Sequence, residues 1–434
     1  MTTNGRGERA YGFRTRAIHA GAIPDAAHGA RALPIYQSSA FVFDDTADAA
    51  ARFALQKYGN IYSRLSNPTV AAFEERVASL EGGLGAVATG SGLGAELITF
   101  AALAGAGDEI VASASLYGGT VTQLDVTLRR FGVSTTFVGS HDAEAYAAAI
   151  TDRTKLVFVE SIANPSGAIA DLDGLADVAH AHGLPLVVDS TVATPYLLRP
   201  MEWGADIVTH SATKFLGGHG TTLGGVVIES GRFDWASGKF PLFTEPVPHY
   251  GGLTWSGNFG EYAFLTRLRT EQLRDLGPVL APHSAWLLAQ GLETLPFRMQ
   301  AHVDNARVVA QWLDADPRVT VVNWAGLPSH PHYDRACRYL PQGSGSVFTF
   351  EVEGGRLAGQ RFIESVDLAS HLANIGDTKT LVIHPASTTH AQLSEQQLLD
   401  GGVAPGLVRI SVGIEDADDI IDDLDQALAK AVAG

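Results

Sequence analysis

The stretch DIVTHSATKFLGGHG, residues 206–220, is the most informative part of the sequence. A short apolar strand is predicted over 207–209, and Lys214 follows it among hydroxyl side chains and ahead of a glycine pair. A lysine in this place can reach a pocket beyond the end of a sheet strand. An isolated lysine near a turn is usually an ordinary surface residue. Here, however, the chain holds only six lysines, at 57, 155, 214, 239, 379 and 430.

Apolar runs alternate with helical stretches on both sides of this segment. Strands are predicted over 86–89, 109–113, 135–138, 156–160, 186–189, 207–209 and 225–228, with a typical intervening helix over 171–182. Continuous apolar strands separated by helices predict an α/β fold, a mostly parallel sheet covered by helices on both faces. Glu160, Asp189 and Lys214 then lie at or just past strand ends, where such sheets bind ligands.

The large domain is predicted over residues 66–293, with an N-terminal arm over 1–65. The arm reads as irregular and is of a kind that packs on another subunit. Asn67 can cap a helix and Pro68 suits the first helical position, so a helix is expected to follow the arm.

The second half of the chain is predicted to hold a long loop and a smaller domain. Residues 231–260 are rich in Gly, Pro and aromatic side chains, which is typical of a loop. A helical region is expected from about 278. A C-terminal α/β domain is predicted over 294–434, with strands near 346–351 and 408–412.

Composition narrows the class of protein. The chain has 434 residues, of which 46% are hydrophobic and 18% charged, and its formal net charge is −17. Such an acidic chain without a basic block is a poor binder of nucleic acid or anionic membranes. Cys337 is the only cysteine, which excludes an internal disulfide. The polar start and the interrupted apolar run at 84–107 argue against a signal peptide and a membrane span, so we expect a cytoplasmic enzyme.

The strand ends carry the residue types that suit pyridoxal 5'-phosphate (PLP). Lys214 can form a Schiff base with its aldehyde. This avoids the roughly 4.6 kcal/mol needed to keep a lysine of pKa about 10.4 neutral at pH 7. Asp189 can keep the pyridine nitrogen protonated, and Tyr117 can stack on the ring. The small residues of TGSGLG, 89–94, let backbone N–H groups approach a phosphate, and Asn164 can bond the ring hydroxyl.

Each of these residues also has an ordinary structural interpretation. Asp189 could cap the next segment, Tyr117 could be a core or turn residue, and Asn164 could belong to a turn. Residues 89–94 could form a simple strand-to-helix turn. The spacing of 25 residues between Asp189 and Lys214, across one βα-type unit, favours the cofactor site.

Metal and hydrolase chemistry have weaker support. His180 and His182 are two apart on a predicted helix and face different ways. His384 and His390 have no acid at ligand spacing, and His210 and His219 flank the lysine without a third ligand. We therefore expect no metal. No GxSxG motif supports a serine hydrolase.

Several long motifs resemble the Cys/Met-metabolism PLP enzymes, the cystathionine γ-synthase-like group of fold type I. They are PIYQSSAFVF (34–43), YGNIYSRLSNPT (58–69), ESIANPSG (160–167), VVDSTVATPYLLRP (187–200), DIVTHSATKFLGGHG (206–220) and VRISVGIED (408–416). The resemblance runs from about 13 to 430. It implies a fold type I PLP-dependent transferase.

Within this family the chain is most similar to the O-acetylhomoserine sulfhydrylases. The similar stretches are 374–394, 273–306 and the insertion containing GRFDWASGKFP at 231–241. Gly119 stands where methionine γ-lyases typically carry a cysteine, which weighs against a dedicated methionine lyase.

The resemblance also implies roles for individual residues. Lys214 would bind the cofactor covalently and move protons, and Arg409 with Asn374 would bind the substrate carboxylate. Cofactor-binding roles would fall to Ser91, Gly92, Leu93, Tyr117, Glu160, Asn164, Asp189, Ser211 and Thr213. Tyr62 and Arg64 would reach the phosphate in the neighbouring subunit. Tyr62 would also contact the substrate, and Tyr62 and Tyr117 would take part in catalysis. A homotetramer built from two dimers is implied.

The implied reaction is γ-replacement of the acetate of O-acetyl-L-homoserine by sulfide, giving L-homocysteine in methionine biosynthesis. Alternatives within the family are a cystathionine γ-synthase and a methionine or cystathionine γ-lyase. Sulfur supply by a thiocarboxylated carrier protein and a non-catalytic PLP-binding scaffold are further alternatives. An acetyl and a succinyl ester differ by pocket contacts worth only about 1–3 kcal/mol, which the sequence does not resolve.

Overall fold

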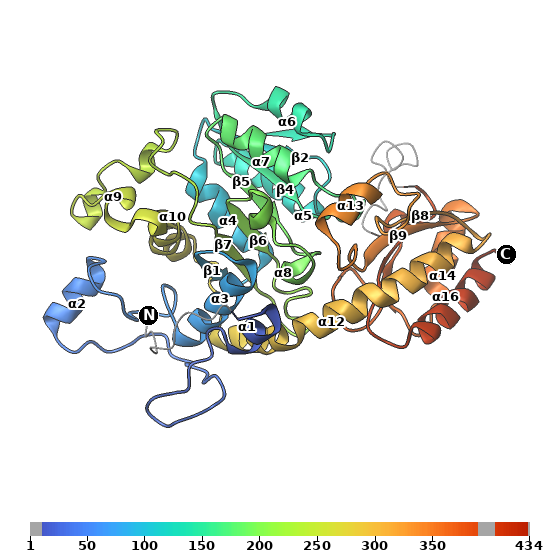
Figure 1. Cartoon of the computed structure of the whole chain (residues 1–434), viewed down its shortest axis with the longest axis horizontal. Coiled ribbons are helices and arrows are strands. Elements are labelled where there is room, and N and C mark those ends of the chain that lie inside the picture. The colour runs from blue at the N-terminus through green and yellow to red at the C-terminus, as the bar shows by residue number, and fades with distance from the viewer. Residues whose placement is uncertain (1–10, 389–403, 433–434) are drawn as a thin grey trace.

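A seven-stranded sheet forms the centre of the large lobe of the molecule (Figure 1). The computed structural model describes residues 11–388 and 404–432. The seven strands of this sheet lie in the order β1-β7-β6-β5-β4-β2-β3. Their bounds are β1 Gly85–Thr89, β2 Glu109–Ser113, β3 Ser134–Val138, β4 Thr154–Glu160, β5 Leu186–Asp189, β6 Ile207–His210 and β7 Gly225–Glu229. All seven predicted strands are present, shifted by two residues at most.

The parallel strands are buried on both faces, as their continuous apolar runs predict. Every residue of β2 and β5 is buried. Only β7 runs antiparallel, to β1 on one side and β6 on the other. Because β7 returns against β6, the segment from Lys214 to Gly224 is a turn at the sheet edge rather than a helical crossover.

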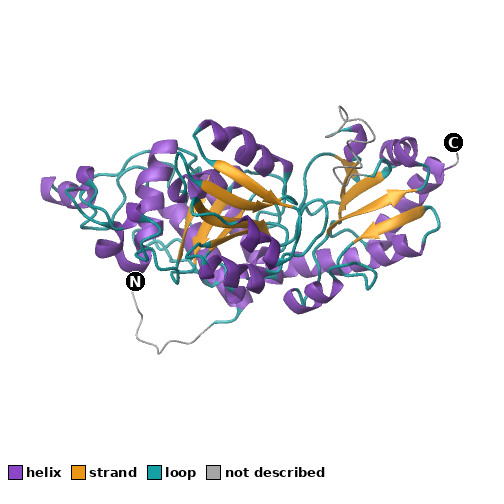
Figure 2. Cartoon of the chain, turned by 90° about the horizontal axis from the view of Figure 1, so that it is seen from above, coloured by secondary structure: helices purple, strands orange, loops and turns teal. Residues whose placement is uncertain are grey.

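Helices cover both faces of this sheet (Figures 1 and 2). As predicted, Asn67 caps α3 by accepting a hydrogen bond from the amide of Thr69, and Gly82 ends the helix in the left-handed region. The helices of the lobe are α3 Pro68–Glu81, α4 Gly92–Leu103, α5 Gly118–Thr122, α6 Ala143–Ala149, α7 Leu172–Ala181, α8 Thr194–Leu197, α10 Ala263–Arg267 and α11 Arg274–Leu276.

Two segments that the sequence left irregular contain helices. The arm includes α1 Phe13–His19 and α2 Thr46–Phe53, and Asp45 caps α2 by accepting from the amide of Asp48. Residues 231–260 include α9 Trp255–Phe259 and two short 3-10 turns. Aromatic packing orders this segment, because Trp235 stacks on Phe243 and Phe264. Contacts between residues that are distant in sequence therefore order residues 231–260, whose local propensity does not favour helices.

The second lobe is built on a five-stranded sheet of order β10-β11-β12-β9-β8. Its strands are β8 Val319–Asn323, β9 Val347–Val352, β10 Ser370–His371, β11 Leu381–Ile383 and β12 Leu407–Ser411. Its helices are α13 Tyr333–Tyr339, α14 Gly355–Ser365 and α16 Ala417–Val432. This combination of strands and helices confirms the predicted smaller α/β fold in the C-terminal part of the chain. Residues 389–403, which include His390, lie outside the described residues.

Helix α12, Pro282–Ala315, joins the two lobes. It contacts α3 in the first lobe and β8 and α16 in the second, and it spans the gap between the sheets in Figure 1. The predicted domain boundary at 293/294 falls inside this helix, so the domain limits stay a prediction. No helix within the described ranges is long and apolar enough to cross a membrane.

Candidate active site

A cavity of about 230 Å³ lies where the first sheet meets the second lobe. Twelve of the fourteen predicted site residues line it: Ser91, Gly92, Leu93, Tyr117, Glu160, Asn164, Asp189, Ser211, Thr213, Lys214, Asn374 and Arg409. Glu160 and Asp189 are the last residues of β4 and β5, and Lys214 follows β6. The cavity is thus formed at the carboxyl ends of parallel strands, as expected for this type of sheet.

Lys214 is held in a tight turn that follows β6. Its amide donates to the carbonyl of Ser211, and its own carbonyl accepts from the amide of Gly218 at 2.7 Å. The ammonium donates to Oδ1 of Asn374. Burial, with a further contribution from the charge of Arg409, lowers the pKa of Lys214 to about 8. The lowered pKa increases the neutral fraction of this amine near neutral pH, which makes it a better nucleophile and base than an ordinary lysine.

Asp189 presents a buried carboxylate to the cavity. Oδ1 accepts from the amide of Thr191 at 2.9 Å, and Oδ2 accepts from the hydroxyl of Thr209 at 3.3 Å. Burial raises the pKa of Asp189 despite these hydrogen bonds. None of the described residues forms an ion pair with it within 4.0 Å, so a cationic group in the cavity would stabilise its charge.

The other end of the cavity is a cradle of small residues. Ser91 caps α4 by accepting from the amide of Gly94 at 3.1 Å. A Cβ at Gly92 would lie 2.7 Å from Cβ of Ser211, so glycine is needed for the close approach of these two segments. The 12-residue helix α4 directs its N-terminal amides towards this end, which suits a phosphate.

Tyr117 and Asn164 are held by one carboxylate. Oε1 of Glu160 accepts from the amide of Tyr117 at 2.6 Å, and Oε2 accepts from the amide of Asn164 at 2.9 Å. Burial, and then the charge of Asp189, raise the pKa of Glu160 to about 8. Because both oxygens of Glu160 face backbone amides, its geometry supports the two walls of the cavity.

Arg409 enters the cavity from β12 of the second lobe. Nη1 donates to Oδ1 of Asn164 at 3.3 Å, and Nη2 donates to the carbonyl of Asn374 at 3.1 Å. No carboxylate in the described part of the chain lies within ion-pairing distance of Arg409. Its remaining N–H groups are suited to an anionic ligand such as a carboxylate.

Two predicted residues, Tyr62 and Arg64, do not line this cavity. Tyr62 is 43% exposed, and the Arg64 guanidinium lies 5.3 Å from the centre of its ring. Nη1 of Arg64 donates to the carbonyl of Arg274. Both lie on the N-terminal arm, so their predicted contact with a neighbouring subunit remains a prediction.

The structure also adds lining residues that the sequence interpretation missed: Glu96, Thr120, Thr191, Val192, Leu223, Ala373 and Ile375. Glu96 is the most significant. Both its oxygens lie within 3.0 Å of the hydroxyl of Thr120, and burial, with the charge of Asp189, raises its pKa well above the ordinary value. Glu96 stands one helical turn after Gly92, so helical periodicity could have identified it.

These groups fit PLP. The close approach of backbone at Gly92, which only glycine allows, suits the phosphate. The buried carboxylate of Asp189, which has no cationic partner among the described residues, suits the protonated ring nitrogen. A lysine of lowered pKa suits the aldehyde. Among residues 11–388 and 404–432, no group of three His, Cys, Asp or Glu side chains is arranged to hold a metal ion.

Comparisons with known proteins agree with this geometry. A sulfhydrylase of Fusarium oxysporum f. sp. lycopersici is 51% identical over 422 residues, which cover 96% of this chain and 98% of that protein. An O-acetyl-L-homoserine sulfhydrylase of Leptospira meyeri is 47% identical, covering 95% of this chain and 96% of its own.

A solved structure from Campylobacter jejuni has the same fold. It is a putative O-acetylhomoserine (thiol)-lyase with N'-pyridoxyl-lysine-5'-monophosphate. It has a TM-score of 0.93 and 38% identity, covering 96% of this chain and all of that one. Residues 14–429 match the family described as Cys/Met metabolism PLP-dependent enzyme. The chain belongs to the Cys/Met metabolism PLP-dependent enzyme family.

Proposed function

We propose that this protein replaces the acetate of O-acetyl-L-homoserine with sulfide, producing L-homocysteine and acetate. One observation carries this proposal: Asn374 joins Lys214 to Arg409. Its side-chain oxygen accepts from Lys214 and its carbonyl accepts from Arg409 at 3.1 Å. An α-amino acid whose carboxylate binds Arg409 therefore has its α-carbon beside Lys214. Relatives that are 47% identical and are named O-acetyl-L-homoserine sulfhydrylase support the choice of substrate.

Three residues would carry the chemistry at the α-carbon. When bound, PLP supplies an aldehyde that condenses with amines and a protonated ring that withdraws electrons from the α-carbon. The neutral amine of Lys214 takes the α-proton and holds it on Nζ for later return. Asp189 stabilises the positive charge on the ring nitrogen, and Arg409 holds the substrate carboxylate so that the α-hydrogen faces Lys214.

The γ-carbon chemistry would occur at the open end of the cavity. Leu223, which is 64% exposed, and Tyr117, which is 51% exposed, border this end. Acetate leaves from the γ-carbon, and sulfide forms the new carbon–sulfur bond at the same carbon. Ser91, Gly92, Leu93, Ser211 and Thr213 are proposed to hold the phosphate at the opposite end.

The N-terminal arm is proposed to complete the site of a second subunit. Tyr62 and Arg64 lie on this arm and do not line the cavity of their own subunit, and Tyr62 is an exposed residue. This placement supports a partner subunit that receives both side chains. The homotetramer and the cytoplasmic location remain predictions.

Product analysis tests the proposed function. The PLP-loaded protein is incubated with O-acetyl-L-homoserine, with and without sulfide, and the products are identified by mass spectrometry. Homocysteine and acetate formed only with sulfide would support the proposal. Oxobutyrate and ammonia as the main products in both tubes would identify a γ-lyase, and cystathionine formed preferentially with cysteine would identify a cystathionine γ-synthase.

A further inference from the structure

The loop of residues 161–170, which connects β4 to α7, reaches the cavity at Asn164, near its tip, and contacts the second lobe elsewhere along its length. The loop folds back on itself, because the amide of Ala163 donates to the carbonyl of Ala168 at 2.9 Å and that of Gly167 donates to the carbonyl of Ala163 at 2.8 Å. Near its tip, Oδ1 of Asn164 accepts from Arg409 at 3.3 Å. The position of this loop therefore affects one of the two described contacts that orient Arg409.

The second lobe holds this loop at places outside the cavity as well. Nδ2 of Asn323, at the end of β8, donates to the carbonyl of Ser166 at 2.6 Å. Nδ1 of His332 lies 3.0 Å from the carbonyl oxygen and 3.3 Å from the amide nitrogen of Ile169. Either tautomer of the imidazole therefore makes a hydrogen bond to Ile169.

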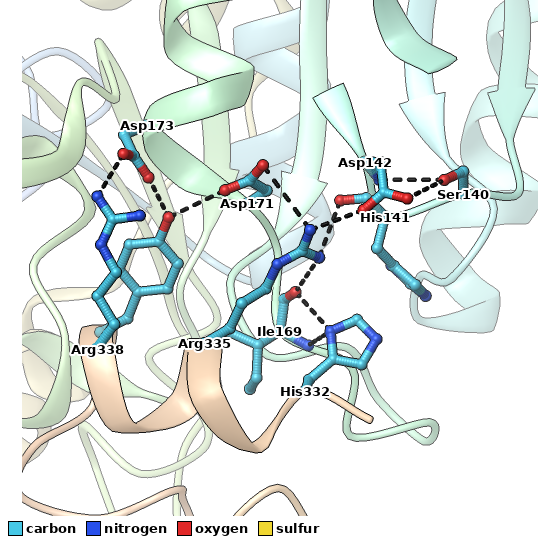
Figure 3. Close-up of polar contacts among 10 residues, drawn as sticks. Ser140, His141, Asp142, Ile169, Asp171, Asp173, His332, Arg335 and Arg338 are labelled. Atoms are coloured by element: carbon cyan, nitrogen blue, oxygen red, sulfur yellow. Dashed lines mark hydrogen bonds and ion pairs between the residues drawn. The ribbon is translucent and has the colours of Figure 1, made fainter. Parts of the chain in front are cut away.

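Arg335 reinforces the contact at Ile169 from the first turn of α13. Figure 3 shows its guanidinium between the carbonyl of Ile169 and the carboxylates of Asp142 and Asp171. Nη2 lies 2.7 Å from Oδ1 of Asp142, and Nη1 lies 3.1 Å from the carbonyl of His141 and 3.5 Å from that of Ile169. One side chain of the second lobe thus binds both the β3–α6 connection and the base of the loop.

We propose that His332 and Arg335 are positioning residues: they hold the loop 161–170 so that Asn164 keeps Arg409 directed at the substrate carboxylate. The effect acts through the backbone of Ile169 and reaches the cavity at Asn164. This inference rests on the proposed role of Arg409 in carboxylate binding. It predicts that a contact at the lobe boundary, away from the reacting atoms, sets the affinity for the amino-acid substrate.

Arg338 offers a matched control on the same helix. Its guanidinium pairs with Asp173 at 2.5 Å and lies 5.2 Å from the ring centres of Trp203 and Tyr339. Arg338 thus bridges the same two lobes by an ion pair, but none of its described contacts is to the loop 161–170. Loss of Arg338 tests for a general weakening of the boundary, whereas loss of Arg335 also removes a contact to the carbonyl of Ile169.

The experiment compares Arg335→Ala, Arg338→Ala, His332→Ala and His332→Asn in the PLP-loaded enzyme. We expect Arg335→Ala and His332→Ala to raise KM for O-acetyl-L-homoserine by roughly five- to twenty-fold, with KM for sulfide changed less than about twofold. Arg338→Ala should leave both KM values within about twofold of the wild type. His332→Asn keeps a polar atom near the position of Nδ1 and should restore most of the affinity.

A binding measurement separates this inference from the proposed function. L-norleucine, which has the α-amino and carboxylate groups but no leaving group, is titrated while the cofactor absorption is followed. Its dissociation constant should rise in Arg335→Ala and not in Arg338→Ala, whichever products the wild-type enzyme forms. Equal changes in both variants, or a change in melting temperature without a change in norleucine affinity, would overturn the positioning role.

Discussion

The carboxyls at the cavity and those at the lobe boundary differ in what surrounds them. Glu96, Glu160 and Asp189 are buried, and burial raises the pKa of each. At the boundary, the Arg335 guanidinium lowers the pKa of Asp142, which is largely exposed. Among the described residues, the cavity carboxyls have no cation within ion-pairing distance, whereas Asp142, Asp171 and Asp173 each have an arginine.

Buried ionisable groups without a charged partner in the described chain therefore mark the place where a ligand would complete the structure. The boundary pairs are satisfied within the chain, so they hold the lobes together and need nothing further. The cavity contains two cations, Lys214 and Arg409, that do not pair with its carboxyls. A cofactor with a protonated ring nitrogen and a phosphate, together with a substrate that carries a carboxylate, would supply charged partners for the groups that the fold leaves unpaired.

The largest effect is expected from Lys214→Ala. Removing the amine removes both the covalent link to the cofactor and the base for the α-proton, so turnover should fall by at least about 10⁴-fold. The fold should survive, because the side chain lines a cavity and is not part of the packed core; far-UV circular dichroism and the melting temperature check this. Near-normal turnover would refute the assignment of Lys214.

A smaller loss is expected from Asp189→Asn. The amide keeps the shape and can still accept from the Thr191 amide, but it no longer provides a negative charge for the ring nitrogen. The value of kcat should fall roughly 10²- to 10³-fold, with weaker PLP binding measured by equilibrium dialysis. If kcat and PLP affinity both stay within a factor of three, Asp189 does not pair with the ring.

The pH dependence of cofactor loading should follow Lys214. Its folded-state pKa of about 8 lies below the ordinary 10.5, so the folded apo-protein loses this proton earlier than the unfolded chain. The rate of PLP uptake should rise with the neutral amine through pH 8 and level off above it, as followed by stopped-flow absorbance. A rate that still rises in proportion to hydroxide up to pH 10 would contradict the lowered pKa.

The lowered pKa of Lys214 also affects the stability of the folded apo-protein. Between about pH 8 and 10.5 the unfolded chain binds more protons at this lysine than the folded apo-protein does. The lysine therefore makes the apo fold relatively more stable as pH rises through that window. Denaturant unfolding of Lys214→Ala should lack this component.

The smallest effect is expected from Glu96→Gln. Because burial raises the pKa of Glu96 well above its ordinary value and so favours its neutral form, the neutral amide should preserve its contact with Thr120, and kcat near neutral pH should stay within about threefold. Infrared difference spectra against the wild type should show the loss of one protonated carboxyl band. A tenfold loss of kcat without that band would mean that Glu96 works as a carboxylate.

Most of the first sheet and of its strand-end residues could be predicted from the sequence. Apolar runs bounded by helices specify buried parallel strands, and Asp189 and Lys214 follow from the rule that such strands direct ligands to their carboxyl ends. Local capping chemistry at Asn67 and Gly82 likewise specifies α3. The resemblance supplied Arg409 and Asn374, which no local pattern identifies.

Only the tertiary structure decided how the second lobe closes the site. Arg409 and Asn164 are 245 residues apart and meet because β12 faces the end of β4 across the boundary. Packing between distant segments likewise determines the raised pKa of Glu96, the antiparallel course of β7 and the contact of Arg335 with Ile169. Strand and cap formation depend on a few neighbouring residues, so the sequence alone specifies them. Burial, electrostatic fields and contacts between lobes depend on the whole fold, so they can be determined only from the tertiary structure.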